Sequence, residues 1–334
     1  MVDVTDLARA VGCEPAVVDW LVAVEEIAGG IPELRSPDPA LRRSAAHELS
    51  DALARRFTLT GDTQCAVTEY RVPTRAGEVT VLRYQPPGDD RPRLGHLSLH
   101  GGGFVLGSVR EVVNDRLLRH RAVASGAEIF AAEYRLAPEH PFPAGLEDCV
   151  DVLSWLIESA PRFGIAPGRI GIGGISAGGN LAGLVAAHAR DNGLPLDHQV
   201  LEVPGASLHI EQDDSYRRFS ALSDFGDLSE IRAAYLGTAD PAPGRWTAPA
   251  EIADLTALPP ALVLTAEFDP LRDSGERYAA RLAEAGVPTL TWRAPGHLHG
   301  STSITGTSAT AREWQRRVID FLHDRARRTT GPLS

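Results

Sequence analysis

The chain contains no lysine, so all 33 basic residues among its 334 residues are arginines. Without a lysine amine, the protein has neither the Schiff-base residue of pyridoxal enzymes nor the lysine of a phosphate-binding P-loop. The arginines are outnumbered by 44 acidic residues, and the formal net charge is −11. Because this charge repels phosphate backbones, and because the arginine runs are short and flanked by acids, we predict no nucleic-acid partner.

Cysteines and long apolar stretches are scarce as well. The three cysteines, Cys13, Cys65 and Cys149, are odd in number and show no Cys-x-x-Cys spacing, so neither a disulfide framework nor a zinc site is expected. No run approaches the length of about eighteen apolar residues that a membrane span needs, and the acids in residues 1–6 do not suit a secretion signal. We therefore predict a soluble, cytoplasmic protein without a membrane span.

What the chain does contain is an alternation of short apolar strands with helical segments. Apolar residues recur at helical spacing over residues 6–57, and two alternating runs, 67–72 and 79–84, predict an antiparallel hairpin. Beyond residue 87, strands and helices alternate, which is typical of an α/β fold with a mostly parallel sheet and helices on both faces. Strands are expected at 97–99, 128–133, 170–173, 199–203, 261–265 and 289–292, and the clearest helices at 144–159, 177–190, 274–285 and 309–323.

One segment has an unusual length. Residues 205–255 separate two expected strands but are too long for a single crossover, and we interpret them as a helical insertion above the carboxyl edge of the sheet. The expected organisation is a helical amino-terminal cap segment (1–57), a core (58–204 and 256–330) and a cap insertion (205–255).

The central signal is a Gly-x-Ser-x-Gly motif around Ser176, directly after the expected strand 170–173 and directly before a helix. A nucleophilic serine at such a turn projects its hydroxyl above the sheet, and Gly174 and Gly178 relieve the crowding that its strained backbone causes. Two alternatives compete: an ordinary serine in a glycine-rich turn, and a dinucleotide-binding loop that starts at Gly171 but has Ser176 at its third glycine position. The flanking strand and helix favour the nucleophile.

A second glycine cluster, His100-Gly101-Gly102-Gly103, follows the expected strand 97–99. Glycines after a strand let backbone N–H groups turn toward one point, and acyl transfer needs such donors where the carbonyl oxygen becomes an oxyanion. A merely flexible turn is the alternative, but the pairing with the serine motif in the correct order favours an oxyanion loop. His100 is interpreted as a structural residue that braces the loop.

An acid and a base should follow the serine in the chain order Ser, acid, His. Asp269 comes after the expected strand 261–265, at the sheet edge where ligands collect, and is the predicted acid. Asp273 is a rival that we interpret as a helix cap, because Asp273 and Glu276 have the capping-box spacing. Glu267, on the same loop, is a less favoured rival.

The predicted base is His299, which lies between the last expected strand and the final helix. His297 stands two residues earlier, a spacing that would suit a metal pair, but no third ligand stands nearby and we expect no metal. We expect His297 to sit elsewhere on the loop and to line the mouth of the substrate pocket, together with Phe104 and Ile175.

These motifs together resemble the bacterial hormone-sensitive-lipase family of α/β-hydrolases. The resemblance implies an α/β-hydrolase fold with a helical cap in two segments. It also implies a catalytic triad of Ser176, Asp269 and His299, and oxyanion-hole N–H groups from Gly101, Gly102 and Ala177. The motifs that carry it are His100-Gly101-Gly102-Gly103-Phe104, Tyr134-Arg135-Leu136-Ala137-Pro138-Glu139-His140-Pro141-Phe142-Pro143-Ala144, Gly174-Ile175-Ser176-Ala177-Gly178-Gly179-Asn180-Leu181-Ala182, Asp269-Pro270-Leu271-Arg272-Asp273 and His299-Gly300.

Two positions depart from the family pattern. The residue before the nucleophile is usually Asp or Thr in the family and is Ile175 here, and the family commonly has Phe where this chain has Ser301. Both positions bear on substrate preference, and neither removes a catalytic group.

We therefore predict a serine hydrolase that cleaves carboxylic esters through an acyl-enzyme, without a cofactor or a metal. The resemblance implies a small-molecule ester with a short to medium acyl chain, and the sequence also allows a homodimer. Among enzymes, the same triad could cleave an amide, a formamide or a lactone, or serve an elimination. In a different class, the chain could be a small-molecule receptor on a retired hydrolase scaffold, which an intact triad argues against.

Overall fold

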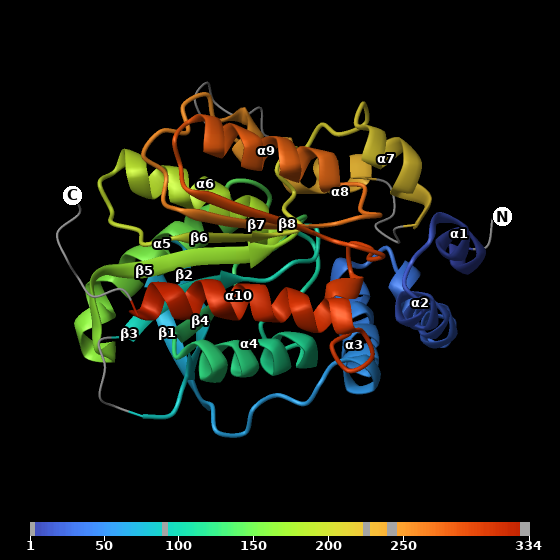
Figure 1. Cartoon of the computed structure of the whole chain (residues 1–334), viewed down its shortest axis with the longest axis horizontal. Coiled ribbons are helices and arrows are strands. Elements are labelled where there is room, and N and C mark those ends of the chain that lie inside the picture. Colours follow the sequence, from blue (N-terminus) through green and yellow to red (C-terminus); the bar gives the residue numbers. More distant parts are fainter. Residues whose placement is uncertain (1–3, 89–92, 223–227, 239–245, 328–334) are drawn as a thin grey trace.

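The computed structural model describes residues 4–88, 93–222, 228–238 and 246–327 (Figure 1). Residues 1–3 of the predicted cap segment, 223–227 and 239–245 of the predicted insertion, and 89–92 and 328–330 of the predicted core lie outside the described residues.

Eight strands of the described residues form one sheet in the order β1-β2-β4-β3-β5-β6-β7-β8. β1 and β2 form the predicted antiparallel hairpin, β2 also pairs antiparallel with β4, and the remaining pairs are parallel. The strands are β1 (Ala66–Thr74), β2 (Gly77–Gln85), β3 (Arg93–Leu99), β4 (Glu128–Ala132), β5 (Ile165–Ile175), β6 (Gln199–Glu202), β7 (Ala261–Ala266) and β8 (Thr289–Ala294).

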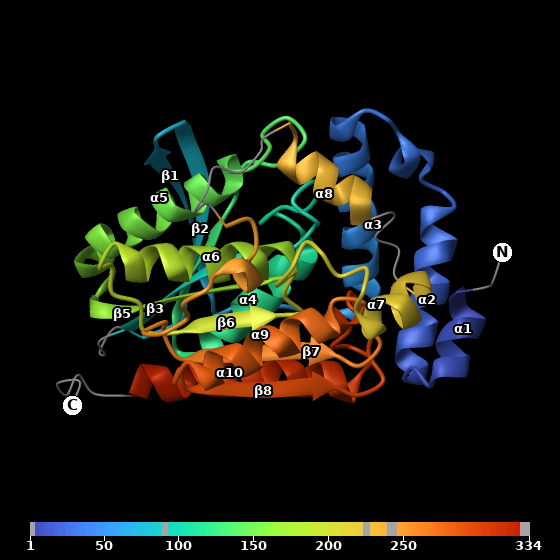
Figure 2. The same ribbon diagram turned by 90° about the horizontal axis from the view of Figure 1, so that it is seen from above.

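Helices cover both faces of this sheet. One face carries α5 (Ala144–Ser159), α6 (Ala177–Asp191) and α9 (Arg272–Glu284), and the other carries α4 (Val112–Ser125) and α10 (Ala309–Arg327), as Figures 1 and 2 show. Because the sheet is covered on both sides, β4, β6 and β7 are buried along their whole length, as is usual for parallel strands. The predicted α/β architecture is confirmed.

The amino-terminal residues 4–57, which we call the leader, form α1 (Val4–Val11), α2 (Pro15–Ala28), a short 3-10 helix (Pro32–Arg35) and α3 (Pro39–Phe57). A proline starts both α2 and α3, where its missing N–H costs no hydrogen bond. Asp38 caps α3 by accepting a 2.9 Å hydrogen bond from the Ala40 N–H. Figures 1 and 2 show the leader beyond the carboxyl ends of the parallel strands.

The described part of the segment between β6 and β7 contains α7 (Asp214–Phe219), α8 (Leu228–Leu236) and two 3-10 helices, Ser220–Leu222 and Pro249–Glu251. Phe219 shares a buried apolar cluster with Val17 and Leu21 of the leader and with Phe268 and Leu298 of the core loops. The leader therefore packs against both the insertion and the loops at the sheet edge.

Two histidines are buried side by side next to β5. His96 of β3 is 4% exposed and His198, which precedes β6, is 0% exposed, and the His96 Nδ1 lies 3.0 Å from the His198 Nε2. A Cβ on Gly171 would lie 2.1 Å from the His198 ring, and a Cβ on Gly173 would lie 2.8 Å from the His96 ring. These glycines are therefore strand residues that make room for imidazoles, which rules out a dinucleotide loop starting at Gly171.

Acid should destabilise the protein through this pair. Burial lowers the pKa of both His96 and His198 below the ordinary value of 6.5, so the fold holds them neutral. As the pH falls below about 6.5, the unfolded chain takes up protons that the folded protein excludes, and stability is lost. We expect the melting temperature to fall between about pH 7 and about pH 5, and to fall less in His198→Asn, whose amide does not titrate. Equal pH slopes in thermal unfolding of the two proteins would contradict this.

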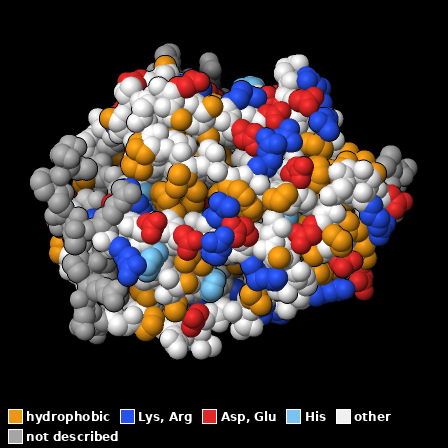
Figure 3. Space-filling model, in the orientation of Figure 1, with side chains coloured by type: hydrophobic (Ala, Val, Ile, Leu, Met, Phe, Trp, Pro, Cys, Tyr) orange, Lys and Arg blue, Asp and Glu red, His pale blue; other side chains and the backbone are white. Residues whose placement is uncertain are grey.

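The outer surface mixes charges of both signs. On the part of the described surface that Figure 3 shows, acidic and basic side chains lie interspersed. In the described parts of the chain, no helix has both the length and the apolar character needed to cross a membrane.

Candidate active site

Ser176 occupies a tight turn between the end of β5 and the start of α6. Its backbone has φ 57° and ψ −115°, a conformation that is rare for a residue with a side chain. A Cβ on Gly174 would lie 2.4 Å from the backbone of Gly178, and a Cβ on Gly178 would lie 2.2 Å from the Leu99 carbonyl oxygen. The expected need for glycine at both positions is confirmed, because the turn packs too closely on itself and on β3 for a side chain.

His299 lies between Ser176 and Asp269. Its Nε2 is 2.8 Å from the Ser176 Oγ, and its Nδ1 is 2.8 Å from the Asp269 Oδ2. Asp269 is fully buried, and its Oδ1 accepts a 2.8 Å hydrogen bond from the Leu271 N–H. The three residues follow β5, β7 and β8, whose carboxyl ends lie at one edge of the sheet. The structure thus brings together Ser176, Asp269 and His299, the three residues predicted from the sequence.

The glycine loop after β3 lies beside Ser176. A Cβ on Gly101 would be 3.5 Å from the Ser176 Cβ, and Gly102 and Gly103 have positive φ angles of 118° and 59°. Within the described residues, the backbone N–H groups of Gly101, Gly102 and Ala177 donate to no other backbone group. Ala177 is also the first residue of α6, where N–H groups lack helical partners. Such donors next to a nucleophile can stabilise a developing anion.

His100 braces this loop, as expected. Its buried ring stacks on Tyr134 with centroids 4.3 Å apart and donates from Nδ1 to the Gly101 carbonyl oxygen at 2.8 Å. The Tyr134 hydroxyl donates to the His100 carbonyl oxygen at 2.7 Å. Burial lowers the pKa of His100, so a neutral ring is favoured.

The predicted capping role of Asp273 is wrong. α9 begins at Arg272, so Asp273 lies inside its first turn, and its carboxylate accepts a 2.8 Å hydrogen bond from the Ser215 N–H of α7. Glu276, the other half of the expected capping box, accepts instead from the Thr265 hydroxyl at 3.0 Å. Asp273 therefore ties the first turn of α7 to α9, a contact between distant segments that residue spacing does not reveal.

Comparison with known proteins identifies the family. A family model described as the alpha/beta hydrolase fold matches residues 96–303, which is more than half of the chain. The chain belongs to the α/β-hydrolase fold family. This hydrolase is 36% identical over 230 residues to an arylesterase of Saccharolobus solfataricus, covering 68% of this chain and 74% of the relative. It is 35% identical over 264 residues to the esterase LipI of Mycobacterium tuberculosis, covering 77% of this chain and 81% of that relative.

A solved structure agrees with these relatives. The bacterial heroin esterase superposes with a TM-score of 0.83 at 30% identity, covering 95% of this chain and 99% of that chain. The predicted resemblance to hormone-sensitive-lipase-like carboxylesterases is confirmed, and the chain is a hydrolase of the carboxylesterase type.

In this hydrolase, the predicted place of His297 at the pocket mouth is wrong. Its ring is fully buried, with Nε2 2.9 Å from the Glu14 Oε2 and Nδ1 2.9 Å from the Ser301 Oγ. Glu14 escaped sequence reasoning because it lies 283 positions away in the chain. The sequence signal for a polar partner of His297 is the hydroxyl of Ser301, which stands where the family commonly has Phe.

Phe104 and Ile175 both flank the glycine loop that follows β3. Phe104 is buried, and its ring stacks on Tyr235 of α8 with centroids 3.7 Å apart. A Cβ on Gly101 would lie 3.3 Å from the Ile175 side chain. The role of Phe104 and Ile175 in a substrate pocket stays a prediction.

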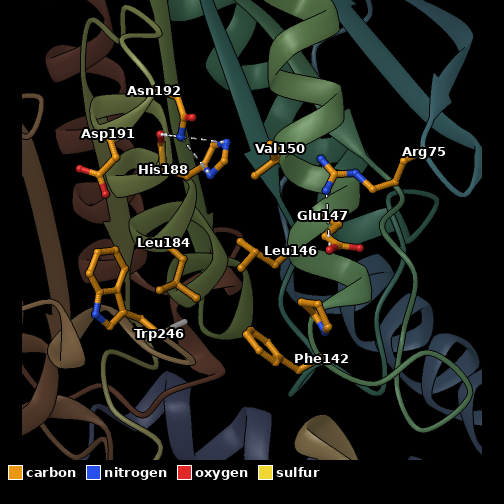
Figure 4. Close-up of a pocket in the computed structure, with 11 residues that line it drawn as sticks. Arg75, Phe142, Leu146, Glu147, Val150, Leu184, His188, Asp191, Asn192 and Trp246 are labelled. Atoms are coloured by element: carbon orange, nitrogen blue, oxygen red, sulfur yellow. Dashed lines mark hydrogen bonds and ion pairs between the residues drawn. The ribbon is translucent and has the colours of Figure 1, made fainter. Parts of the chain in front are cut away.

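A cavity of about 270 Å³ lies apart from the triad, where α5 and α6 meet Trp246 (Figure 4). His188 on its wall is about 18 Å along α6 from Ser176, at about 1.5 Å per residue. Polar groups at its rim are already paired, since Arg75 donates to Asp151 at 2.6 Å and the Asn192 amide donates to the His188 carbonyl oxygen at 2.8 Å. None of the residues that line this cavity belongs to the triad or to the glycine loop after β3, so the cavity is distinct from the candidate active site.

Proposed function

We propose that this hydrolase cleaves carboxylic esters through an acyl-enzyme formed on Ser176, with His299 as general base and then general acid. Asp269 orients the imidazole. The observation that carries the proposal is the continuous line of hydrogen bonds from Asp269 through His299 to Ser176, with 2.8 Å at each step. Serine, acid and histidine in this chain order are typical of α/β-hydrolases.

The buried carboxylate decides which nitrogen of His299 carries the proton. An ionised carboxylate only accepts, so the His299 Nδ1–H donates to Asp269 and Nε2 is left as an acceptor for the Ser176 hydroxyl. When the Ser176 Oγ attacks the ester carbonyl carbon, the hydroxyl proton passes to Nε2. The negative charge of Asp269 then stabilises the imidazolium.

The carbonyl oxygen takes up negative charge as the tetrahedral intermediate forms. We assign its stabilisation to the N–H groups of Gly101, Gly102 and Ala177, helped by the positive end of the α6 dipole. Collapse of the intermediate breaks the bond to the alcohol, which leaves with the proton from the His299 Nε2. Water then attacks the acyl-enzyme with the same base, releasing the acid and restoring Ser176.

Short to medium acyl chains are the proposed substrates, because the hormone-sensitive-lipase family implies them. Hydrolysis of p-nitrophenyl esters from acetate to laurate tests this, with Ser176→Ala as the blank. We expect kcat/KM to fall by more than about tenfold between the best short ester and laurate. A matched p-nitroanilide and a small lactone should react more slowly than the best ester. A maximum at laurate would contradict the chain-length proposal, and a faster anilide or lactone would contradict the ester proposal.

We also propose a cytoplasmic location. Its support is that Cys13, Cys65 and Cys149 are all buried and unpaired, which suits a reducing compartment. Burial raises the pKa of the Cys13 thiol to about 12, so this thiol is a poor nucleophile. Cell fractionation tests the location, and light scattering tests the homodimer that the sequence allows.

A further inference from the structure

The leader reaches the loop that carries His299. The Glu14 N–H donates to the Gly296 carbonyl oxygen at 2.9 Å, and the Glu14 Oε2 lies 2.9 Å from the His297 Nε2. The same carboxylate oxygen accepts a 2.8 Å hydrogen bond from the Ser308 hydroxyl, which in turn accepts from the Ala311 N–H in the first turn of α10. Glu14 thereby joins the start of α2 to both ends of the segment that contains the base.

The carboxylate of Glu14 determines which hydrogen the His297 ring donates. Glu14 as a carboxylate only accepts, so the His297 Nε2 carries the hydrogen that is donated to it. The His297 Nδ1 lies 2.9 Å from the Ser301 Oγ, and the single Ser301 hydroxyl proton can be donated either to this nitrogen or to the Leu298 carbonyl oxygen at 3.0 Å. The Ser301 Oγ also accepts a 2.9 Å hydrogen bond from the Leu298 N–H. His297 therefore connects Glu14 to Ser301 and, through the Ser301 hydroxyl, to the backbone of Leu298, the residue before His299.

The leader also contacts this loop through an aromatic ring. A Cβ on Gly300, the residue after His299, would lie 3.1 Å from the Trp20 ring of α2. A Cβ on Gly296 would lie 3.1 Å from the Glu14 nitrogen, and Gly296 has a positive φ of 72°. Glycines before and after His299 thus allow the leader to approach the loop that carries this histidine closely.

A second arm of the leader reaches the oxyanion loop. Arg43 of α3 donates from Nε to the Val105 carbonyl oxygen at 2.8 Å and from a terminal nitrogen to the Ala137 carbonyl oxygen at 2.7 Å. Its other terminal nitrogen donates to the Glu139 carboxylate at 2.8 Å. The Ala137 N–H donates to the carbonyl oxygen of Phe104, directly after the three glycines. One guanidinium therefore fixes the outer turn of the oxyanion loop.

From these contacts we propose that Glu14 and Arg43 are positioning residues. Glu14 holds the loop that carries His299, and Arg43 holds the oxyanion loop, so that both loops keep their positions relative to Ser176. The inference rests on the proposed function, because it assigns the alignment of that same site to the leader. If the leader only covered the site, changes in it would alter which substrates bind. If the leader aligns the catalytic groups, changes in it alter the chemical step after binding. A displacement of about 1 Å in a reacting group can cost about 100-fold in rate, so small losses of alignment are measurable.

Steady-state kinetics on p-nitrophenyl acetate separates the two roles. We expect Glu14→Ala and Arg43→Met each to lower kcat by about 10- to 100-fold while KM changes by less than about threefold. Glu14→Gln should recover most of the rate, because its amide oxygen still accepts from His297. Arg43→Lys should recover less, because an ammonium lacks the planar fork that reaches two carbonyl oxygens at once.

Matched controls lie on the same helices. Glu26 on α2 is 69% exposed and Arg55 on α3 is 62% exposed, so Glu26→Ala and Arg55→Met should keep the original kcat. Thermal unfolding of every variant separates lost alignment from lost folding. If Glu14→Ala does not fold, Glu14→Asp retains the charge with a shorter reach and should show the same fall in kcat.

An unchanged kcat in folded Glu14→Ala and Arg43→Met, or a rise in KM alone, would overturn the proposal and leave the leader as a cover. An equal loss of rate in the exposed controls would also overturn it. These outcomes are distinct from a failure of the proposed function, which would appear as ester hydrolysis that survives in Ser176→Ala.

Discussion

Ser176→Ala is expected to lower kcat for ester hydrolysis by about 10⁴- to 10⁶-fold, leaving a residual rate from substrate binding and the oxyanion loop. The physical reason is that alanine has no oxygen to attack the carbonyl, while the Ser176 Oγ lies 2.8 Å from the His299 Nε2 that would take its proton. Burst and steady-state kinetics on the best p-nitrophenyl ester measure the loss.

Two further measurements check this interpretation. A fluorophosphonate probe should label Ser176 and no other residue, since Ser301 and Ser308, whose hydroxyls lie beside His297, are fully buried. Combining His299→Ala with Ser176→Ala should add little to either loss, because residues that act as a unit are not additive. Labelling at another residue, or losses that multiply, would contradict the assignment of Ser176.

Asp269→Asn is expected to lower kcat by about 10⁴-fold with the fold intact. The Asp269 Oδ1 accepts from the Leu271 N–H, so the asparagine oxygen would occupy that position and its amide nitrogen would face the His299 Nδ1. Two donors would then meet unless the imidazole proton moved to Nε2. A protonated Nε2 does not accept from the Ser176 hydroxyl, and the base would be lost.

Asp273→Asn is the matched control, four positions away in the same segment. Its carboxylate accepts from the Ser215 N–H at 2.8 Å and from the neighbouring Arg272, and an asparagine oxygen can still accept from Ser215. We expect kcat to stay within about threefold of the original and the melting temperature to fall by a few degrees at most. Comparable losses of kcat in Asp273→Asn and Asp269→Asn would reverse the two assignments.

The features that could be predicted from the sequence share a local cause. The turn at Ser176 requires glycine two residues before and two residues after it, so the whole pattern lies within five consecutive positions of the chain. The strands and helices follow from apolar periods of a few residues. The grouping of Ser176, Asp269 and His299 follows from one rule, that parallel strands end at the same edge of a sheet.

The features that sequence reasoning missed depend on contacts between distant segments. Asp273 had the spacing of a helix cap, yet its carboxylate is bound by Ser215, which lies 58 positions earlier. The sequence around His297 contains nothing that indicates its buried partner, because Glu14 comes from the other end of the chain. Residue spacing describes what a side chain could do locally, and tertiary packing decides which partner it meets.

The histidines beside β5 also restrict how this chain can change during evolution. Because a Cβ at position 171 would lie 2.1 Å from the His198 ring, Gly171 and His198 compete for one space. A mutation of Gly171 is tolerated only after the imidazole has been replaced by a smaller side chain, whereas the reverse order passes through a clash. The two positions are therefore epistatic: a side chain at position 171 should occur only together with a smaller residue at position 198, whereas a change at position 198 can occur alone.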